Sequence, residues 1–331
     1  MNTSILLKSR PKGKPTLNDF QFVPDEIPPI EKGEILLKTV YVSVDPYLRG
    51  RMNDAKSYIP PFRLNQPISS GIIAEVTESK HPGFTKGDFV SGVLEWKKFQ
   101  KSNGKGLMKV DPAKAPLSAY LGILGLTGLT AYLGLTEIGK PKKGETLFVS
   151  DAAGAVGSVV GQIGKIMGCR VVGTVGTDEK ADLLKSTFAF DEAINYKTVP
   201  NLRKAIATAC PDGIDVYFDN VGGPVSDAVL FNINQFARIV VCGAISLYNE
   251  TRMPMGMRIE PFLIKSSALM QGFIVNDYAK KFPDAIKQLS TWIATGKLKY
   301  KETIVEGFEN IPLAFLDLFE GKNTGKMVVK V

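Results

Sequence analysis

A strand, a glycine-containing loop and a helix follow one another between residues 146 and 168, and this succession constrains the fold most. The apolar run TLFVS (146–150) predicts a buried strand, and SVVGQIGKIMG (158–168) carries apolar residues at helical spacing. The loop between them, AAGAVGS (152–158), departs from the G-x-G-x-x-G pattern at its first position, where Ala152 stands. Taken alone, it indicates either a dinucleotide phosphate loop or a tight packing turn without a ligand.

The segments after this loop continue the alternation of strands and helices. Further apolar strands are predicted at RVVGTV (170–175), IDVYFDNVGG (214–223), RIVVCGAIS (238–246) and MQGFIV (270–275). Apolar strands that alternate with helices predict a parallel sheet covered on both faces. Residues 1–115 instead carry short β-type runs with Pro and Gly, and the terminal KMVVKV is β-like again. We therefore expect an α/β chain in which a doubly wound parallel-sheet domain is inserted late into an irregular β domain.

Composition argues against several classes of function. The 331 residues carry a net charge of +8, but the basic residues are scattered, and the densest cluster, at 97–109, suggests a solvated loop. Nucleic acid is therefore not an expected partner. Residues 115–136 carry no charge and are long enough to cross a bilayer, yet their glycines and threonines favour a buried helix hairpin. No signal peptide is evident, and dispersed cysteines predict reduced thiols in the cytoplasm.

Metal-dependent catalysis is also not expected. His81 is the only histidine, and Cys169, Cys210 and Cys242 are far apart, whereas a catalytic zinc commonly takes three protein ligands. The same shortage argues against Ser–His–Asp or Cys–His catalysis. Hydride transfer remains, because there a nicotinamide cofactor carries the difficult step.

The end of the second strand bears on which nicotinamide cofactor is used. Sheets that prefer NAD place Asp or Glu there, but this strand ends in Val175-Gly176-Thr177. Asp178 and Glu179 follow, and we expect them to begin and cap the next helix. Thr177 and Lys180 offer a hydroxyl and a cation to a 2′-phosphate, which favours NADP(H). The alternative is that Lys180 is an ordinary exposed helix lysine.

Tyr248 is the candidate for proton donation. It follows the strand that ends at Cys242-Gly243, and ligands of open α/β sheets bind beyond the carboxyl ends of strands. A tyrosine hydroxyl stays protonated at neutral pH, so that it can donate to a developing oxyanion. The alternative is a loop tyrosine that only covers apolar surface.

These segments together resemble the zinc-independent medium-chain dehydrogenases/reductases. Within that family the chain is similar to the prostaglandin reductase, leukotriene hydroxydehydrogenase and alkenal double-bond reductase group. The residues that carry the resemblance are YVSVDPYLRGRM (41–52), LGLTGLTAY (124–132), AAGAVGS (152–158), VGTDEK (175–180), NYKTV (195–199), DVYFDNVGG (215–223), CGAISLYN (242–249), GFIV (272–275), VEGFENIPLAF (305–315) and GKNTGK (321–326). SYIPPFRLNQPI (57–68) resembles the bacterial, curcumin-reductase-like branch.

The resemblance implies a division into domains and an activity. It implies a GroES-like substrate domain over 1–122 and 298–331 and a Rossmann NADP-binding domain over 123–297. It implies a homodimer that uses NADPH to reduce the carbon–carbon double bond of α,β-unsaturated ketones and aldehydes, with hydride going to the β-carbon. Two alternatives stay open, namely a quinone reductase and a cofactor-binding, redox-sensing protein without turnover.

The resemblance also implies the role of individual residues. Tyr248 matches the tyrosine assigned to the substrate oxygen, while Tyr47 and Arg51 would border the substrate pocket. The alternative for that stretch is a turn at Asp45-Pro46 with arginines that are surface charges. Asp45 stands where zinc-dependent relatives carry their first cysteine ligand. The residues expected to bind the cofactor are Gly154, Ala155, Val156, Gly157, Thr177, Lys180, Tyr196, Asn220, Cys242, Gly243, Ala244, Ile245, Ser246, Tyr248, Phe273, Ile274, Val275 and Asn323.

Overall fold

The computed structural model describes residues 2–331, which form two compact units. The first unit comprises the described residues up to Gly122 together with Glu302–Asn323 and Met327–Val331. The second comprises Ile123–Lys301 and Thr324–Lys326. The chain therefore leaves the first unit after about a third of its length and returns to it near its end.

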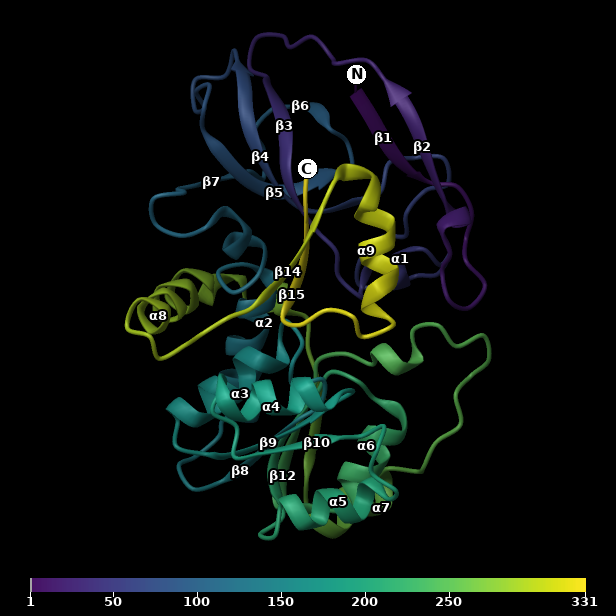
Figure 1. Ribbon diagram of the computed structural model, residues 1–331, viewed down its shortest axis with the longest axis vertical. Coiled ribbons are helices and arrows are strands. Elements are labelled where there is room, and N and C mark those ends of the chain that lie inside the picture. The colour runs from purple at the N-terminus through teal and green to yellow at the C-terminus, as the bar shows by residue number, and fades with distance from the viewer. Residues whose placement is uncertain (1) are drawn as a thin grey trace. The chain divides into compact units, whose positions relative to one another are not determined.

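The first unit is built on a seven-stranded sheet (Figure 1). Its strands run in the order β14-β15-β3-β4-β5-β7, and β6 also pairs with β3. Their bounds are β3 (Ile35–Ser43), β4 (Ser69–Ser79), β5 (Phe89–Glu95), β6 (Phe99–Ser102), β7 (Met108–Val110), β14 (Glu302–Glu306) and β15 (Lys326–Lys330). β15 runs antiparallel to β3, with Val328 opposite Ser43. The terminal strand thus rejoins the first sheet, as its β-like sequence predicts.

A hairpin and two helices complete this unit. The strands β1 (Asn2–Leu7) and β2 (Phe20–Asp25) pair antiparallel, and the helices are α1 (Leu48–Arg51) and α9 (Ile311–Leu318). The core contains Ile5, Ile72, Trp96 and Phe315, each with at most 1% of its surface exposed. Residues from both chain segments therefore share one core.

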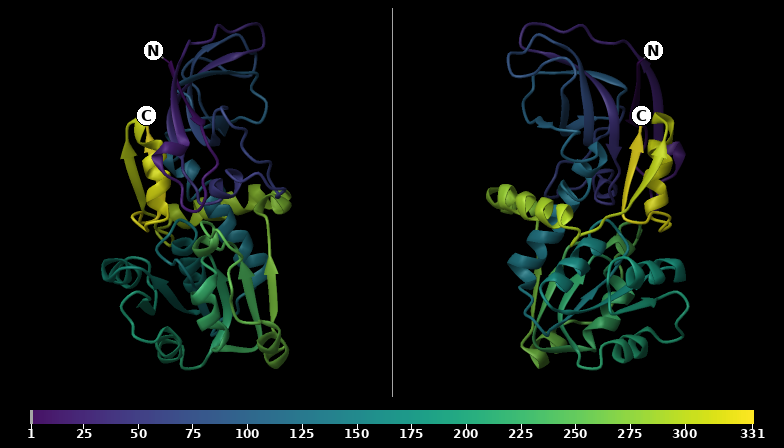
Figure 2. Two further views of the ribbon diagram at one scale, coloured as in Figure 1. Left: turned by 90° about the vertical axis from the view of Figure 1, so that its right-hand side faces the viewer. Right: turned by 60° about the vertical axis from the view of Figure 1, so that its left-hand side comes forward.

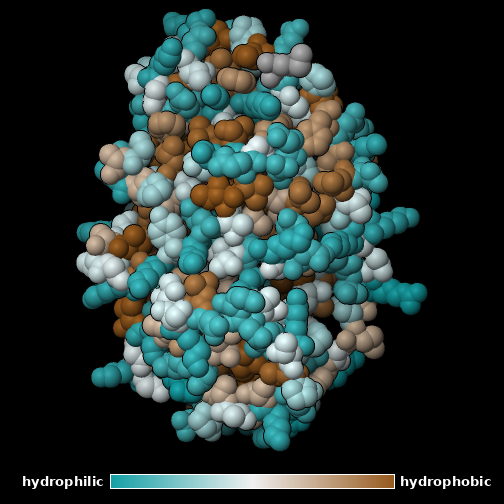
Figure 3. Space-filling view, in the orientation of Figure 1, coloured by the Kyte–Doolittle hydropathy of each residue, from teal (hydrophilic) through white to brown (hydrophobic). Residues whose placement is uncertain are grey.

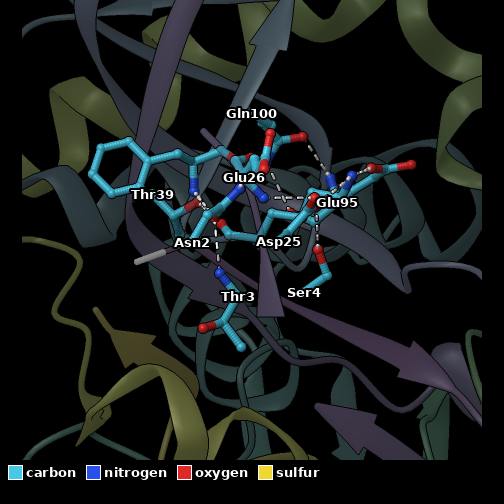
Figure 4. Close-up of polar contacts among 10 residues, drawn as sticks. Asn2, Thr3, Ser4, Asp25, Glu26, Thr39, Glu95 and Gln100 are labelled. Atoms are coloured by element: carbon cyan, nitrogen blue, oxygen red, sulfur yellow. Dashed lines mark hydrogen bonds and ion pairs between the residues drawn. The ribbon is translucent and has the colours of Figure 1, made fainter. Parts of the chain in front are cut away.

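Polar contacts tie the first strand to the rest of this unit (Figure 4). The Asn2 amide donates to the carbonyl oxygens of Glu26 and Phe99, each at 3.0 Å, and Ser4 Oγ donates to an Asp25 carboxylate oxygen at 3.1 Å. Thr39 Oγ1 donates to a carbonyl oxygen in the same region. The bonds from Asn2 and Thr39 satisfy backbone carbonyl oxygens beside the hairpin, and the bond from Ser4 links its two strands.

The second unit is a six-stranded parallel sheet in the order β10-β9-β8-β11-β12-β13. In chain order this is 3-2-1-4-5-6, the doubly wound Rossmann arrangement. The strands are β8 (Thr146–Val149), β9 (Arg170–Val175), β10 (Glu192–Asn195), β11 (Ile214–Asp219), β12 (Ile233–Val241) and β13 (Leu269–Gly272). The predicted parallel sheet is confirmed, and β9 has the bounds expected from its sequence.

Helices cover both faces of this sheet (Figures 1 and 2). On one face, residues of α5 (Leu202–Ala209), α6 (Gly223–Leu230) and α7 (Glu260–Ser266) join Phe148, Val172 and Tyr217 in one core. The other face carries α3 (Gly157–Ile166) and α4 (Asp178–Ser186), which contact β8, β9 and β10. Because a strand side chain points to alternate faces, Leu147 and Phe148 serve different cores.

The prediction of a helix hairpin in the middle of the chain needs correction. Residues 115–136 do not form a helix hairpin; a short 3-10 turn (Leu117–Leu121) precedes α2 (Leu126–Leu133), which continues into a π-helical turn (Gly134–Gly139). Gly128 lets the Ile123 carbonyl group pack against α2, because a Cβ there would overlap that group. Within residues 2–331, no helix is both long enough and apolar enough to cross a membrane.

The basic cluster at 97–109 is also not a free loop. It contains β6 and β7, and several of its lysines are paired with acids. Lys101 lies 3.2 Å from Glu34 and Lys109 lies 2.6 Å from Asp88. Over the face drawn in Figure 3, hydrophilic residues are interspersed with smaller apolar areas. These ion pairs and the two strands show that the cluster is not the solvated loop that the sequence predicts.

Candidate active site

Most of the predicted site residues lie at one edge of the second sheet. The site residues lie in the segments that directly follow the carboxyl ends of the strands, including the first turns of α3 and α4. In the order β8, β9, β10, β11, β12 and β13, these segments carry Gly154 to Gly157, Thr177 and Lys180, Tyr196, Asn220, Cys242 to Tyr248, and Phe273 to Val275. Parallel strands end at the same edge, so the fold brings these segments together (Figure 1). Three predicted residues lie elsewhere: Tyr47, Arg51 and Asn323 belong to the first unit.

The glycine loop joins β8 to α3 as the sequence predicts. A Cβ at Gly157 would lie 2.8 Å from the Ala152 Cα and would overlap the Asp151 carbonyl oxygen, so only glycine fits there. Ser158 Oγ donates to the Gly154 carbonyl oxygen at 2.8 Å. The amides at the start of α3 and the helix dipole then face the loop, which suits an anionic ligand.

Ala152 occupies the position where the fingerprint has its first glycine. Its N–H donates to the Thr174 carbonyl oxygen at 3.0 Å, and the residue is fully buried. A Cβ at Gly173 would lie only 2.5 Å from the Ala152 methyl group. The turn therefore accepts alanine because Gly173 on β9 makes room for the methyl group.

A buried hydrogen-bond network supports the neighbouring strand end. Ser150 Oγ donates to Asp219 at 3.0 Å and accepts the backbone N–H of Asn220 at 2.9 Å. The Asn220 side-chain amide donates to the Ser150 carbonyl oxygen at 2.8 Å. Asp219 also accepts the N–H groups of Val221 and Gly222, each at 2.9 Å. Sequence reasoning missed Ser150 and Asp219, since only the pairing of β8 with β11 brings them together.

The loop after β12 is anchored to the loop after β11. Backbone N–H groups of Cys242 and Gly243 donate to the Asp219 carbonyl oxygen at 2.8 and 3.0 Å. The Ser246 N–H and Oγ both donate to the Val221 carbonyl oxygen, at 3.1 and 2.6 Å. These bonds place Tyr248 directly after a short 3-10 turn (Ile245–Leu247).

The Tyr248 hydroxyl folds back over its own loop. It accepts the Ala244 N–H at 3.2 Å, and a Cβ at Gly243 would lie 3.3 Å from it. Burial raises the pKa of Tyr248, and this outweighs the opposing effect of the Ala244 hydrogen bond. The hydroxyl therefore stays protonated, with one acceptor position used and its own proton available to donate.

Cations and hydroxyls gather around Gly176, where β9 ends. A Cβ at Gly176 would lie 3.4 Å from Tyr196 Oη and 3.5 Å from Lys197 Nζ. Burial lowers the pKa of Lys180, and the positive charge of Lys197 lowers it further. The two ammonium groups are therefore close enough to repel each other. Sequence reasoning missed Lys197, although it directly follows Tyr196 in NYKTV.

Thr177 caps the next helix, and this corrects the expectation that Asp178 and Glu179 do so. Its side-chain oxygen accepts the Lys180 N–H at 3.3 Å, while the two acids lie in the first turn of α4. The Thr177 hydroxyl keeps its proton to donate, because in the cap it serves as an acceptor. The cap bond fixes the backbone of Lys180 at this point of the strand edge.

The residues that directly follow Asn323 contact the glycine loop. The Gly325 N–H donates to the Ala153 carbonyl oxygen at 2.7 Å, and Gly325 forms a parallel bridge with Gly154. At the other end of the sheet edge, the Phe273 ring packs against Gly134, where a Cβ would lie 2.6 Å from its tip. The Phe273 side chain therefore belongs to the core, which leaves its backbone to line the edge.

Tyr47 and Arg51 lie at the two ends of α1. The Arg51 guanidinium stacks 3.9 Å from the Phe62 ring centre and donates to the Pro60 carbonyl oxygen at 3.0 Å. Desolvation raises the pKa of Tyr47. Arg49 is buried, and its guanidinium donates to the Gly13 carbonyl oxygen at 2.8 Å, so the alternative that both arginines are surface charges is wrong.

The structure offers no cluster for a metal. Among residues 2–331, no group of three or more His, Cys, Asp or Glu side chains could hold a metal ion. The single histidine, His81, accepts the Gly83 N–H at 2.9 Å, and its ring lies tilted against the Phe84 ring with the centres 5.1 Å apart. The cysteines Cys169 and Cys210 are buried, and burial raises the pKa of each thiol.

Comparison with protein families agrees with this architecture. Residues 3–110 match the N-terminal domain of oxidoreductases, and residues 155–291 match the domain called zinc-binding dehydrogenase. YfmJ of Bacillus subtilis (strain 168), whose name provisionally describes an NADP-dependent oxidoreductase, is 58% identical over 330 residues, covering 99% of this chain and 97% of that protein. A 2-alkenal reductase (NADP(+)-dependent) of Nicotiana tabacum is 43% identical over 335 residues, covering 100% and 97%.

A solved structure is also similar over the whole chain. The crystal structure of CurA from Vibrio vulnificus in complex with NADPH has a TM-score of 0.95 and 44% identity, covering 99% of each chain. A GroES-like first unit and a Rossmann second unit are the architecture of an oxidoreductase. The chain belongs to the medium-chain dehydrogenase/reductase family.

Proposed function

We propose that this enzyme uses NADPH to reduce the carbon–carbon double bond of α,β-unsaturated ketones and aldehydes without a metal. The observation that carries the proposal is the protonated Tyr248 hydroxyl, which accepts the Ala244 N–H and keeps its own proton to donate. The similarity to a 2-alkenal reductase supports this class of substrate, and the similarity to CurA in complex with NADPH supports the cofactor.

The second unit suits a dinucleotide. The tight turn at Ala152, the glycine at position 157 and the amides of α3 form a cradle for a pyrophosphate. Lys180, Tyr196 and Lys197 would hold a 2′-phosphate at the end of β9. When bound, NADPH supplies the hydride that reaches the β-carbon of the substrate. We propose that residues 123–297 form the Rossmann domain that binds the cofactor and that residues 1–122 and 298–331 form the substrate domain.

The protein's own part in the reaction is to orient the substrate and to stabilise negative charge on its carbonyl oxygen. Tyr248 would donate a hydrogen bond to that oxygen, and a preorganised donor of this kind typically contributes about 10²–10³ in rate. Tyr47 and Arg51 would border the substrate. Arg51 donates hydrogen bonds to the carbonyl oxygens of Pro60 and Ser69, and these bonds fix the loop between those two residues to the end of α1.

Tyr248→Phe tests the proposal. We expect kcat for 2-nonenal to fall by about 10²-fold, because the oxyanion loses its donor, while the Kd for NADPH stays within about twofold. Tyr120→Phe is the control, since its hydroxyl contacts the Asp111 carbonyl oxygen in the first unit. If Tyr248→Phe keeps full activity, Tyr248 is not the donor.

A screen of enals, enones and quinones decides between the candidate functions. The quinone reductase alternative wins if benzoquinone is reduced with a higher kcat/KM than every enal and enone. A protein that binds NADPH yet reduces none of these compounds would be a sensor without turnover. Light scattering tests the proposed homodimer, and cell fractionation tests the proposed cytoplasmic location.

Replacing the lysines tests the choice of cofactor. Lys180→Ala and Lys197→Ala should each weaken NADPH binding by about tenfold, as expected for a charge-assisted contact to phosphate. NADH binding should hardly change, because NADH has no 2′-phosphate. Equal losses for the two nucleotides would show that these lysines do not contact the phosphate.

A further inference from the structure

An acidic side chain lies inside the predicted phosphate cradle. Asp151 directly precedes the glycine loop, and its φ of +48° lies in the left-handed region. Its carboxylate occupies the space that the missing side chain of Gly154 leaves open. A Cβ at Gly154 would come within 2.9 Å of the Asp151 carboxyl carbon and would overlap one of its oxygens. In a dinucleotide-binding loop this second glycine lets the backbone approach a phosphate, so here an anion of the chain itself lies in its way.

The charge of Asp151 acts on the same groups that would bind a 2′-phosphate. Lys180, on α4, attracts the Asp151 carboxylate, and Asp151 in turn raises the pKa of Lys180 against the larger lowering effect of burial. In the loop after β10, burial raises the pKa of Tyr196, and the charge of Asp151 raises it further. Lys197 acts on Lys180 as a second cation. Asp151 therefore already neutralises part of the positive charge at this edge of the sheet.

The proton occupancy of Asp151 changes in an accessible range of pH. The surrounding protein raises its pKa to about 6, and Lys180 opposes this increase. The residue is also exposed to solvent, and water offsets part of the desolvation. The carboxylate is therefore charged at pH 8 and loses charge as the pH falls toward 5.

We propose that Asp151 determines nucleotide selectivity, because its carboxylate competes with the 2′-phosphate for Lys180 and so weakens binding of NADPH more than binding of NADH. This inference rests on the proposed NADP(H) site. A 2′-phosphate carries about 1.5 to 2 negative charges near neutral pH, whereas NADH presents a neutral hydroxyl at that position. Both nucleotides carry the pyrophosphate, so any repulsion of that group by Asp151 is common to the two and cancels in the ratio of affinities. The additional 2′-phosphate of NADPH is repelled by a neighbouring carboxylate, whereas the ribose hydroxyl of NADH can donate to one.

Asp151→Asn is the decisive variant. It keeps the size of the side chain, and asparagine adopts the left-handed region as readily as aspartate does. At pH 8 we expect the ratio of NADPH affinity to NADH affinity to rise by about tenfold, which corresponds to one unfavourable charge contact of roughly 1.4 kcal/mol. Asp151→Gly should give a similar rise, which excludes an effect of the amide itself. Glu179→Gln is the control, since it removes one exposed acid from the first turn of α4.

The measurement is direct titration of each protein with NADPH and NADH, followed by nicotinamide fluorescence, with 2′,5′-ADP and 5′-AMP titrated by calorimetry. The advantage of Asp151→Asn over the wild type should be largest at pH 8 and should shrink as the pH falls toward 5, because Asp151 then gains a proton. The 2′-phosphate also gains a proton near pH 6, and its smaller charge reduces the repulsion in the same direction.

Three results would overturn the proposal. Asp151→Asn could change NADPH and NADH binding equally, leave both unchanged, or lower the affinity ratio, and in each case Asp151 does not set selectivity. A different result concerns the underlying site: if the wild type binds neither nucleotide, the proposed NADP(H) site itself fails. A wild type that binds NADPH, together with an unchanged ratio in the variant, refutes the selectivity role alone.

Discussion

Gly157→Ala provides a sharp test of the glycine loop. The new methyl group would lie 2.8 Å from the Ala152 Cα and would overlap the Asp151 carbonyl oxygen. Both neighbours are backbone, so that no side-chain rotation can relieve the clash. Either α3 or the turn at Asp151 and Ala152 must move, and each of them forms part of the proposed phosphate cradle.

Two opposing effects set the size of the change in stability. Forcing an extra methyl group into a packed site costs about 1–3 kcal/mol, and two backbone contacts place this case near the upper end. Alanine is favoured over glycine in a helix by about 1 kcal/mol. We therefore expect a net loss of about 1–2 kcal/mol, which corresponds to a fall in Tm of about 3–6 °C for a unit of this size.

The assay combines thermal unfolding with NADPH titration. Gly157→Ala should lower Tm and raise the Kd for NADPH at least tenfold. Gly50→Ala is the matched control, because Gly50 is also helical and no atom lies within 4 Å of its added Cβ. It should keep or slightly raise Tm and leave the Kd unchanged. If Gly157→Ala matches the wild type in both measurements, the loop does not have the packing described here.

Three further predictions concern polar groups. Ser150→Ala leaves the Asn220 N–H without its acceptor and should destabilise the protein by about 1–3 kcal/mol, measured by urea unfolding. Burial opposes ionisation of Glu145, but hydrogen bonds from Arg238 and from a backbone N–H prevail and lower its pKa. The charged Glu145 therefore stabilises the fold above the unfolded pKa of about 4.3, and this stabilisation is lost at lower pH. Glu145→Gln should therefore lower Tm at pH 7 but hardly at pH 3. Because burial raises the pKa of Tyr248, the rate of reduction should show no loss from its ionisation below about pH 10, and a titration near pH 8 that disappears in Tyr248→Phe would contradict this.

The sequence by itself was sufficient for the local elements of the second unit and for the edge where the site lies. The apolar runs before Ser150 and Gly176 indicate buried parallel strands, and the ligand edge of such a sheet follows from its topology. The second strand ends at Val175-Gly176-Thr177 without an acid that could hold a ribose hydroxyl, and this favoured NADP(H) over NAD(H). These features are local, because the strand period and the turn residues are contained within a few neighbouring positions.

Only the tertiary structure decided which distant groups meet at that edge. Ser150 and Asp219 are 69 residues apart and bond only because β8 pairs with β11. Gly325 reaches Ala153 only because the chain returns there near its end. The Asp151 carboxylate lies over Gly154 because a left-handed backbone angle turns it into the loop. Hydrophobic periodicity records which face of an element is buried, but it contains no information on the partner across a long separation in sequence, so these contacts could not be read before the fold was known.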